Sequence, residues 1–144
     1  MKIFLGGTYD TTWGDYVKAH IDCKNIVDNS KQITTLHDVS VNDGLKTDCD
    51  VHVYCVTPRN RENYYTFADV FDSANLLPDG KTLLCILLDE LHDYFSIKEQ
   101  KSLYMFAYKA KEHGVAVFDN LDLMCVYLND MYNDELASKT NPDD

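Results

Sequence analysis

Short apolar runs alternate along the chain with longer segments in which apolar residues recur at helical spacing. The clearest run, VHVYCV at 51–56, contains no Asp, Glu, Lys or Arg and predicts a strand buried on both faces. Pro58 follows, and because proline cannot donate to a sheet ladder, the strand is expected to end near it. The next segment carries apolar residues at i, i+3, i+4 and i+7, which predicts an amphipathic helix: Phe67, Val70, Phe71 and Ala74.

The same alternation covers the rest of the chain. Further strands are predicted at 2–5 (KIFL), 32–36 (QITTL), 82–88 (TLLCILL) and 115–118 (VAVF). Further helices are predicted over 13–21, after the capping box Ser96-x-x-Glu99, and over 121–132. Residues 39–47 suit a short helix, although Asn42-Asp43-Gly44 equally suits a turn. Strands that alternate with helices predict an α/β fold, with a five-stranded, mainly parallel sheet and helices on both faces.

Length and charge narrow the class of protein. A chain of 144 residues suggests one domain, here residues 1–133, followed by a polar tail at 134–144. With 24 acidic and 13 basic residues the net charge is −11, which argues against direct nucleic-acid binding. An acidic surface that imitates nucleic acid remains a minor alternative. Neither a signal peptide nor an apolar run of membrane-spanning length is evident, so a cytoplasmic protein with no membrane partner is expected.

Cysteine and histidine give no sign of a metal site. The five cysteines include no CxxC pair, and Cys55, Cys85 and Cys125 lie in apolar patterns where a free thiol packs as a small hydrophobe. The five histidines are scattered without the spacing of metal ligands. Core packing is therefore expected for these cysteines, and no metal is expected.

Candidate chemistry is expected where strands end, because ligands of open α/β sheets bind at the carboxyl ends of the strands. Gly6-Gly7 follows the first strand directly and would let a ligand approach the backbone closely. Asp69, near the start of the central helix, suits an ionised nucleophilic carboxylate. The simpler interpretation is that Thr66-x-x-Asp69 forms a capping box. Trp13 is either a core residue or, with Tyr9, an aromatic surface on which a base stacks.

The order of several motifs resembles the nucleoside 2-deoxyribosyltransferase-like family. The motifs are FLGGT, CDVHVYCVTP, YYTFADVFDSAN, KTLLCIL and GVAVFDNLDLMCVYL, and they extend over nearly the whole chain. The resemblance implies a Rossmann-like or flavodoxin-like three-layer sandwich. It also implies an enzyme in which a carboxylate attacks C1′ of a 2′-deoxynucleoside and displaces the base, which is then replaced by another base or by water.

The resemblance assigns roles to individual residues. Asp69 matches the nucleophile, which is usually Glu in the family, and Glu62 lies nearest to the expected carboxylate acid, although Asn63 competes for that slot. The residues assigned to substrate binding are Gly6, Gly7, Tyr9, Asp10, Trp13, Thr57, Asn63, Tyr65, Asp72 and Asn75. The resemblance implies no metal or organic cofactor, and it implies a homo-oligomer.

Three hypotheses follow from the sequence. The first is an enzyme that exchanges or hydrolyses the N-glycosidic bond of a nucleoside or nucleotide, with a free base as co-substrate or product. The second is a module of the same fold that binds a nucleotide or a nucleotide-derived signal without turning it over. The third is an acidic protein-interaction module.

Overall fold

Within the residues that the structure describes, five strands form a single parallel sheet. The structure is a computed structural model and describes residues 1–7, 11–28, 35–58, 64–87 and 93–140. The strands are β1 (Ile3–Leu5), β2 (Ile26–Asp28), β3 (Val51–Val56), β4 (Thr82–Ile86) and β5 (Ala116–Phe118). They lie side by side in the order β2-β1-β3-β4-β5, and every neighbouring pair is parallel. This is the strand order of flavodoxin-like folds.

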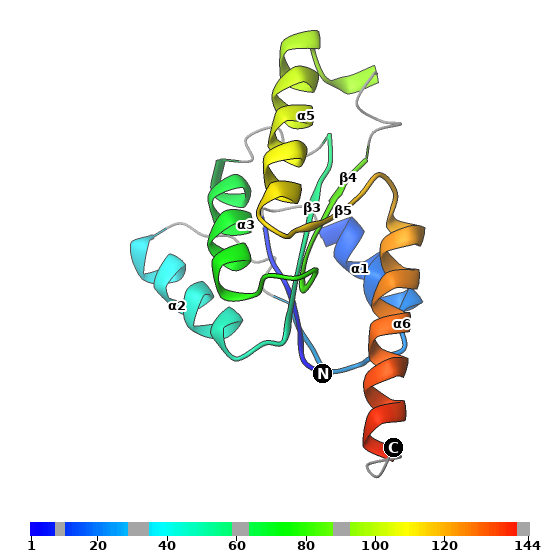
Figure 1. Cartoon of the computed structure of the whole chain (residues 1–144). Helices are drawn as coiled ribbons and strands as arrows, with labels where there is room; N and C mark the ends of the chain where they lie inside the picture. Colours follow the sequence, from blue (N-terminus) through cyan, green and yellow to red (C-terminus); the bar gives the residue numbers. More distant parts are fainter. Residues whose placement is uncertain (8–10, 29–34, 59–63, 88–92, 141–144) are drawn as a thin grey trace.

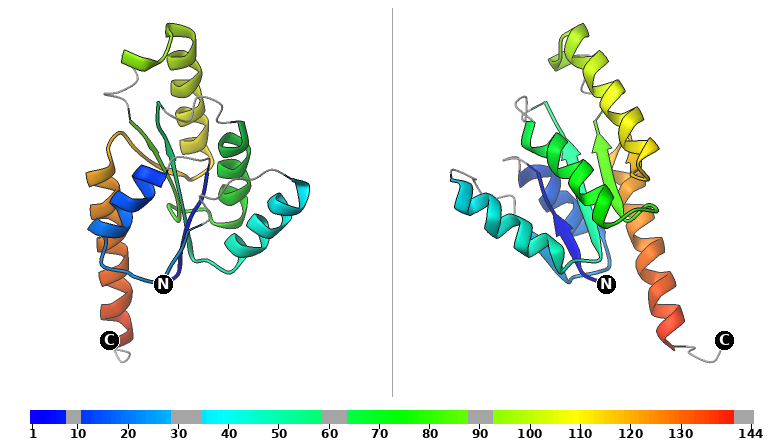
Figure 2. Two further views of the ribbon diagram at one scale, coloured as in Figure 1. Left: turned by 180° about the vertical axis from the view of Figure 1, so that it is seen from behind. Right: turned by 60° about the vertical axis from the view of Figure 1, so that its left-hand side comes forward.

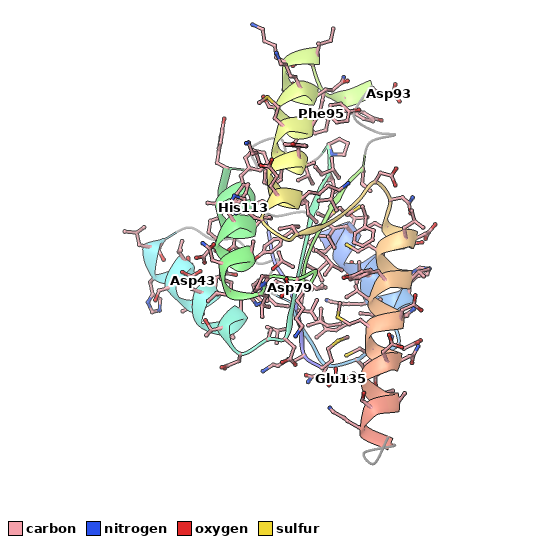
Figure 3. The ribbon with its side chains drawn as sticks, in the orientation of Figure 1. Asp43, Asp79, Asp93, Phe95, His113 and Glu135 are labelled. Carbon is pink, nitrogen blue, oxygen red and sulfur yellow. The ribbon has the colours of Figure 1, made fainter. Side chains whose placement is uncertain are left out.

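Helices cover both faces of the sheet and complete three layers (Figures 1 and 2). One face carries α1 (Thr11–His20) and α6 (Leu121–Thr140), and the other carries α2 (Leu36–Thr47), α3 (Tyr64–Leu76) and α5 (Ile97–Glu112). In Figure 3, Asp43 on α2 and Glu135 on α6 accordingly lie on opposite sides of the sheet. In the sheet, β2 lies on one side of β1 and β3 lies on the other, so the order of strands reverses after β2. Because crossovers are right-handed, this reversal places α1 and α2 on opposite faces.

Each face of the sheet has its own apolar core, as the alternation of side chains along β3 shows. Val51, Val53 and Cys55 face the helices α1 and α6, whereas Tyr54 and Val56 face α3 and α5. The prediction that cysteines pack in the core is confirmed, since the cysteines are buried and free of disulfides: Cys23, Cys49, Cys55, Cys85 and Cys125. The predicted fold class, a mainly parallel α/β sandwich, is likewise confirmed.

Of the strand predicted at 32–36, residues 32–34 lie outside the described part of the chain, and Thr35 and Leu36 do not form a strand. The second strand lies earlier, at Ile26–Asp28, where three half-buried residues form an edge of the sheet beside β1. Thr35 instead begins a helix, because its hydroxyl accepts from the backbone N–H of Asp38 while the Asp38 carboxylate accepts from the Thr35 N–H. The capping box explains why Thr35 and Leu36 belong to a helix and not to the predicted strand. The helix then continues through Asn42-Asp43-Gly44, so the helical interpretation holds and the turn does not.

The last helix is longer than the apolar stripe predicts. It continues to Thr140, well into the segment expected to be a polar tail, and Glu135 pairs with the N-terminal ammonium group at 3.3 Å. Among the helices described, none combines the length and the apolar character needed to cross a membrane.

Candidate functional site

The two glycines after β1 allow backbone, ring and helix to come together at the point where the strand ends. Gly6 donates its N–H to the Val53 carbonyl at 2.9 Å, and a Cβ on Gly6 would lie 2.6 Å from ring atoms of both Phe4 and Tyr54. Gly7 has a φ of 100°, which favours glycine, and a Cβ there would lie 3.3 Å from Thr66 Oγ1. The turn therefore seats β1 against the first turn of α3. The turn lies at the carboxyl ends of β1 and β3. The order of strands in the sheet reverses between these two strands, and ligands of this fold bind at such a point.

Asp69 lies on the buried face of α3. The helix begins at Tyr64, so Thr66 is its third residue and cannot be the N-cap, and the capping-box interpretation of Thr66 and Asp69 is wrong. No acidic residue falls in the first turn of α3, and Asp69 is the sixth residue of the helix. The helix dipole, which acts over the first turn, is therefore not what holds its charge. Its side chain is only 3 % exposed.

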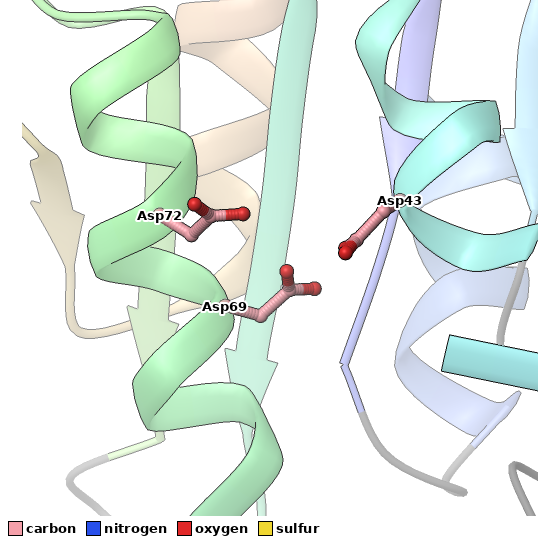
Figure 4. A group of neighbouring side chains, drawn as sticks. All are labelled: Asp43, Asp69 and Asp72. Carbon is pink, nitrogen blue, oxygen red and sulfur yellow. The ribbon is translucent and has the colours of Figure 1, made fainter. Parts of the chain in front are cut away.

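A lysine from another helix supplies the charge partner. Lys46, near the end of α2, is 1 % exposed, and its ammonium group donates to Asp69 Oδ1 and, at 2.6 Å, to Asp72 Oδ2. Asp43 Oδ1 lies 3.5 Å from the same ammonium group. Figure 4 shows Asp69 and Asp72 extending from α3 toward α2, and Asp43 extending from α2 toward them. We call Lys46 and these three aspartates the carboxylate cluster.

The carboxylate cluster has the spacing of metal ligands but already contains a cation. Oxygens of the three aspartates lie within 4.8 Å of one another, as ligands of a divalent ion do. The Lys46 ammonium group occupies the space between them and bonds two of the three. The arrangement is therefore complete as an ion-pair cluster, and we assign no metal to it.

The electrostatic environment keeps the charges of this cluster in place. Burial by itself lowers the pKa of Lys46, and hydrogen bonds to Asp69 and Asp72 more than offset it, so that its pKa is raised. Burial, followed by the negative charge of Asp69, raises the pKa of Tyr65 to about 12. The same two causes raise the pKa of Tyr54 well above its ordinary value. Both phenols beside Asp69 are therefore neutral.

A chain of hydrogen bonds lies beneath the cluster. His52 Nε2 lies 2.7 Å from the Lys46 carbonyl, which can only accept, so Nε2 carries the proton and Nδ1 is free to accept. The Ser73 hydroxyl lies 2.8 Å from Nδ1 and donates to it, and the Tyr54 hydroxyl, 2.6 Å from Ser73 Oγ, then donates to Ser73. Burial lowers the pKa of His52, which favours this neutral form. The chain ties β3, α2 and α3 together.

Two buried oxygens on the same face of α3 make no hydrogen bond of regular geometry with the described residues, although a weaker interaction between the Tyr54 hydroxyl and the Asp69 carboxylate contributes to the raised pKa of that phenol. They are Asp69 Oδ2 and Thr66 Oγ1, three positions apart and hence one turn apart along the helix. Thr66 is the residue against which Gly7 packs. An ionised oxygen that is buried without a partner is costly, and such groups in native structures commonly have a functional reason. These two atoms are therefore candidate contact points for a ligand, and we call them the open oxygens.

Other predicted site residues fall at varied distances from the open oxygens. Thr57 is buried directly after β3, and the Tyr65 hydroxyl accepts from the Asn42 amide. Asp72 joins the carboxylate cluster, whereas Asn75 is exposed near the far end of α3. Four predicted residues lie outside the described part of the chain: Tyr9, Asp10, Glu62 and Asn63.

Trp13 belongs to the core on the opposite face of the sheet. It is 2 % exposed and packs with residues of α1 and α6, so the core interpretation of this residue is confirmed. Its indole Nε1 has no hydrogen-bond partner among the residues described. Nothing in its packing places the ring beside Asp69.

A separate cavity of about 440 Å³ lies between α5, β5 and the start of α6. Aromatic side chains, Tyr104, Tyr108 and Phe118, form much of its wall, and Lys111 and Asp119 add charge. Of the predicted site residues that the structure describes, none lines this cavity.

Sequence reasoning missed the residues that surround Asp69: Lys46, His52, Tyr54 and Ser73. Lys46 lies in the stretch where helix and turn were equally plausible, so its face was undefined. His52 and Tyr54 are the alternate positions of β3 that point toward α3, and Ser73 follows Asp69 by four residues on the same face. The available signal is therefore the spacing of polar residues along each element. Alternate positions of β3 and positions three or four apart on α3 lie on the faces that pack together.

Comparisons of the chain with protein-family models, with curated proteins and with solved structures give no match. The class of protein is thus defined by the structure itself: a flavodoxin-like α/β sandwich. Its distinguishing feature is the carboxylate cluster between α2 and α3, in which Lys46 and Asp69 are buried.

Proposed function

We propose that the protein cleaves or exchanges the N-glycosidic bond of a deoxynucleoside or nucleotide, with Asp69 as the nucleophile. The observation that carries this proposal is the state of the Asp69 carboxylate. One oxygen is bound to the Lys46 ammonium group, while Oδ2 makes no hydrogen bond of regular geometry with the described residues. The resemblance to nucleoside 2-deoxyribosyltransferases supports the same residue. Its carboxylate is one methylene shorter than the Glu usual in that family.

In the proposed reaction, Oδ2 attacks C1′ of the sugar and forms a C1′–O bond. The C1′–N bond breaks, and its electron pair leaves with the base, which takes up a proton from solvent or from an acid in the site. A nitrogen of a second base, or a water molecule, then attacks C1′ and loses a proton, and Asp69 leaves as a carboxylate. Two displacements give net retention at C1′, as in retaining glycosidases.

A second function, nucleotide binding without turnover, is favoured by a specific observation. Asp69 is buried and its other oxygen is bound to Lys46, so a sugar can reach Oδ2 only after neighbouring groups move. After the same movement, a hydroxyl of a ligand could donate to the carboxylate without any covalent step. This alternative keeps the same residues and removes only the chemistry.

The test is base exchange between a panel of deoxynucleosides and free bases, followed by chromatography. Asp69→Asn keeps the shape of the side chain but removes its charge, and we expect exchange to fall by at least about a thousandfold, as for loss of a nucleophile. Asp134→Asn, the same change at an exposed position on α6, serves as the matched control and is expected to leave the rate unchanged.

Trapping distinguishes the two functions directly. A 2′-fluoro-2′-deoxynucleoside slows the second displacement, so the wild-type protein should gain the mass of the sugar and Asp69→Asn should not. A nucleoside that raises the melting temperature without any product or mass change would instead support binding alone. Full exchange activity in Asp69→Asn would show that the nucleophile is assigned wrongly.

A further inference from the structure

We propose that Lys46 is the positioning residue of this site and that Asp72 preserves its charge balance during the reaction. The inference rests on the proposed function and extends it to two residues that do not touch the reacting carbon. Lys46 holds Asp69 through Oδ1, which leaves Oδ2 as the oxygen that attacks. Fixing one oxygen also fixes the orientation of the carboxylate plane, and orientation contributes strongly to catalysis.

The charge-balance role of Asp72 follows from the number of carboxylates that bind the Lys46 ammonium group. When Oδ2 bonds to C1′, Asp69 becomes a neutral ester, and the positive charge of Lys46 loses its buried partner. An uncompensated charge at a 1 % exposed position is strongly unfavourable. Asp72 Oδ2, 2.6 Å from the ammonium group, still neutralises it in that state. The surplus of acid around Lys46 therefore suits a carboxylate that loses and regains its charge in each cycle.

The groups around the pair are otherwise neutral or distant. From α2, Asp43 lies 3.5 Å from the ammonium group and is more than half exposed. From β3, His52 and Tyr54 face α3, and from α3 itself Tyr65 approaches Asp69; burial favours the neutral form of all three. Asp72 is thus the closest carboxylate, besides Asp69 itself, that the described residues offer Lys46.

The experiment compares wild-type protein with Lys46→Met, Lys46→Arg and Asp72→Asn in steady-state base exchange across pH. Lys46→Met should lower kcat about a hundredfold with KM changed less than about threefold, since orientation rather than substrate contact is lost. Its pH profile should also differ from that of the wild-type protein, because the cation beside Asp69 is removed. Lys46→Arg, which keeps the charge, should restore part of kcat.

Asp72→Asn provides a second variant that does not depend on a buried substitution, because the Asp72 side chain is 58 % exposed. It should lower kcat about tenfold with KM unchanged, since only the charge-depleted state is affected. Lys18→Met removes a lysine that pairs with Asp28 away from the site and is the matched control.

The outcomes separate this inference from the function on which it rests. If the wild-type protein exchanges bases and Lys46→Met matches its kcat and pH profile, Lys46 has no positioning role and the proposed function stands. If the wild-type protein turns over no nucleoside, the proposed function fails and the role of Lys46 fails with it. If Lys46→Met does not fold, Asp72→Asn decides: a kcat equal to wild type overturns the charge-balance role, and a selective loss of kcat supports it.

Discussion

A buried lysine and a buried histidine meet at the centre of the polar layer between β3 and α3. Lys46 remains charged there because its ammonium group donates hydrogen bonds to carboxylates, whereas His52 remains neutral because burial lowers its pKa. The two residues are linked directly, since the carbonyl that accepts from His52 belongs to Lys46. The charge of Lys46 thus depends on its carboxylate partners, and the neutral form of His52 depends on its burial.

The neutral state of His52 predicts how stability depends on pH. Its pKa is lowered in the folded protein, so below pH of about 6.5 the unfolded chain binds a proton that the folded chain resists. The stabilising contribution is therefore complete above that pH and is lost as the pH falls toward the lowered pKa. We expect the free energy of unfolding, measured with urea, to decrease as the pH is lowered from about 7 to about 5.

His52→Gln should flatten this decrease, because glutamine has no proton to take up. His37→Gln, at an exposed position on α2, is the matched control and should leave the slope as it is. An identical slope in wild-type protein and His52→Gln would mean that other groups cause the pH dependence.

At the scale of elements, α2 is held to the rest of the molecule by polar groups rather than by an apolar stripe. Its buried residues are Asn42 and Lys46, which bond Tyr65, Asp69 and Asp72 of α3. The capping box at Thr35 fixes its start, and Gly44 lies inside it. A helix of this kind is specified by its partners, which explains why its own sequence is compatible with a turn.

Two glycine substitutions should therefore have opposite effects. Nothing lies within 4 Å of a Cβ at Gly44, so Gly44→Ala should stabilise the protein by about 0.5–1 kcal/mol through the higher helix propensity of alanine. A Cβ at Gly6 meets two aromatic rings at 2.6 Å, so Gly6→Ala should destabilise the protein by about 1–3 kcal/mol. Urea unfolding of both variants measures the difference, and equal effects would contradict the packing described for the β1 turn.

At the scale of the whole molecule, the sequence predicts the sheet better than the site. Residues 51–56 and 82–86 form strands, as their continuous apolar runs indicate. A strand buried on both faces is apolar at every position, so its own sequence is enough to predict it. The edge strand β2 at 26–28 is not predicted, since three half-buried residues carry little pattern. Asp69 could be singled out by its position, but Lys46 could not, because the contact joins residues 23 apart across two helices. Such pairs depend on packing that local patterns do not encode.

The excess of acidic residues gives a last prediction for the molecule as a whole. With 24 acidic and 13 basic residues, like charges repel one another across the folded surface and destabilise the compact state. Added sodium chloride screens exposed charges over about 10 Å at 0.1 M, while the buried pair of Lys46 and Asp69 is screened much less. The melting temperature at neutral pH should therefore rise as sodium chloride increases from about 0.01 M to about 0.15 M. An uncharged osmolyte at the same osmolality is the control for effects other than screening. A melting temperature that falls with salt would show that exposed ion pairs such as Lys109–Glu112 and Lys139–Glu135 outweigh the overall repulsion.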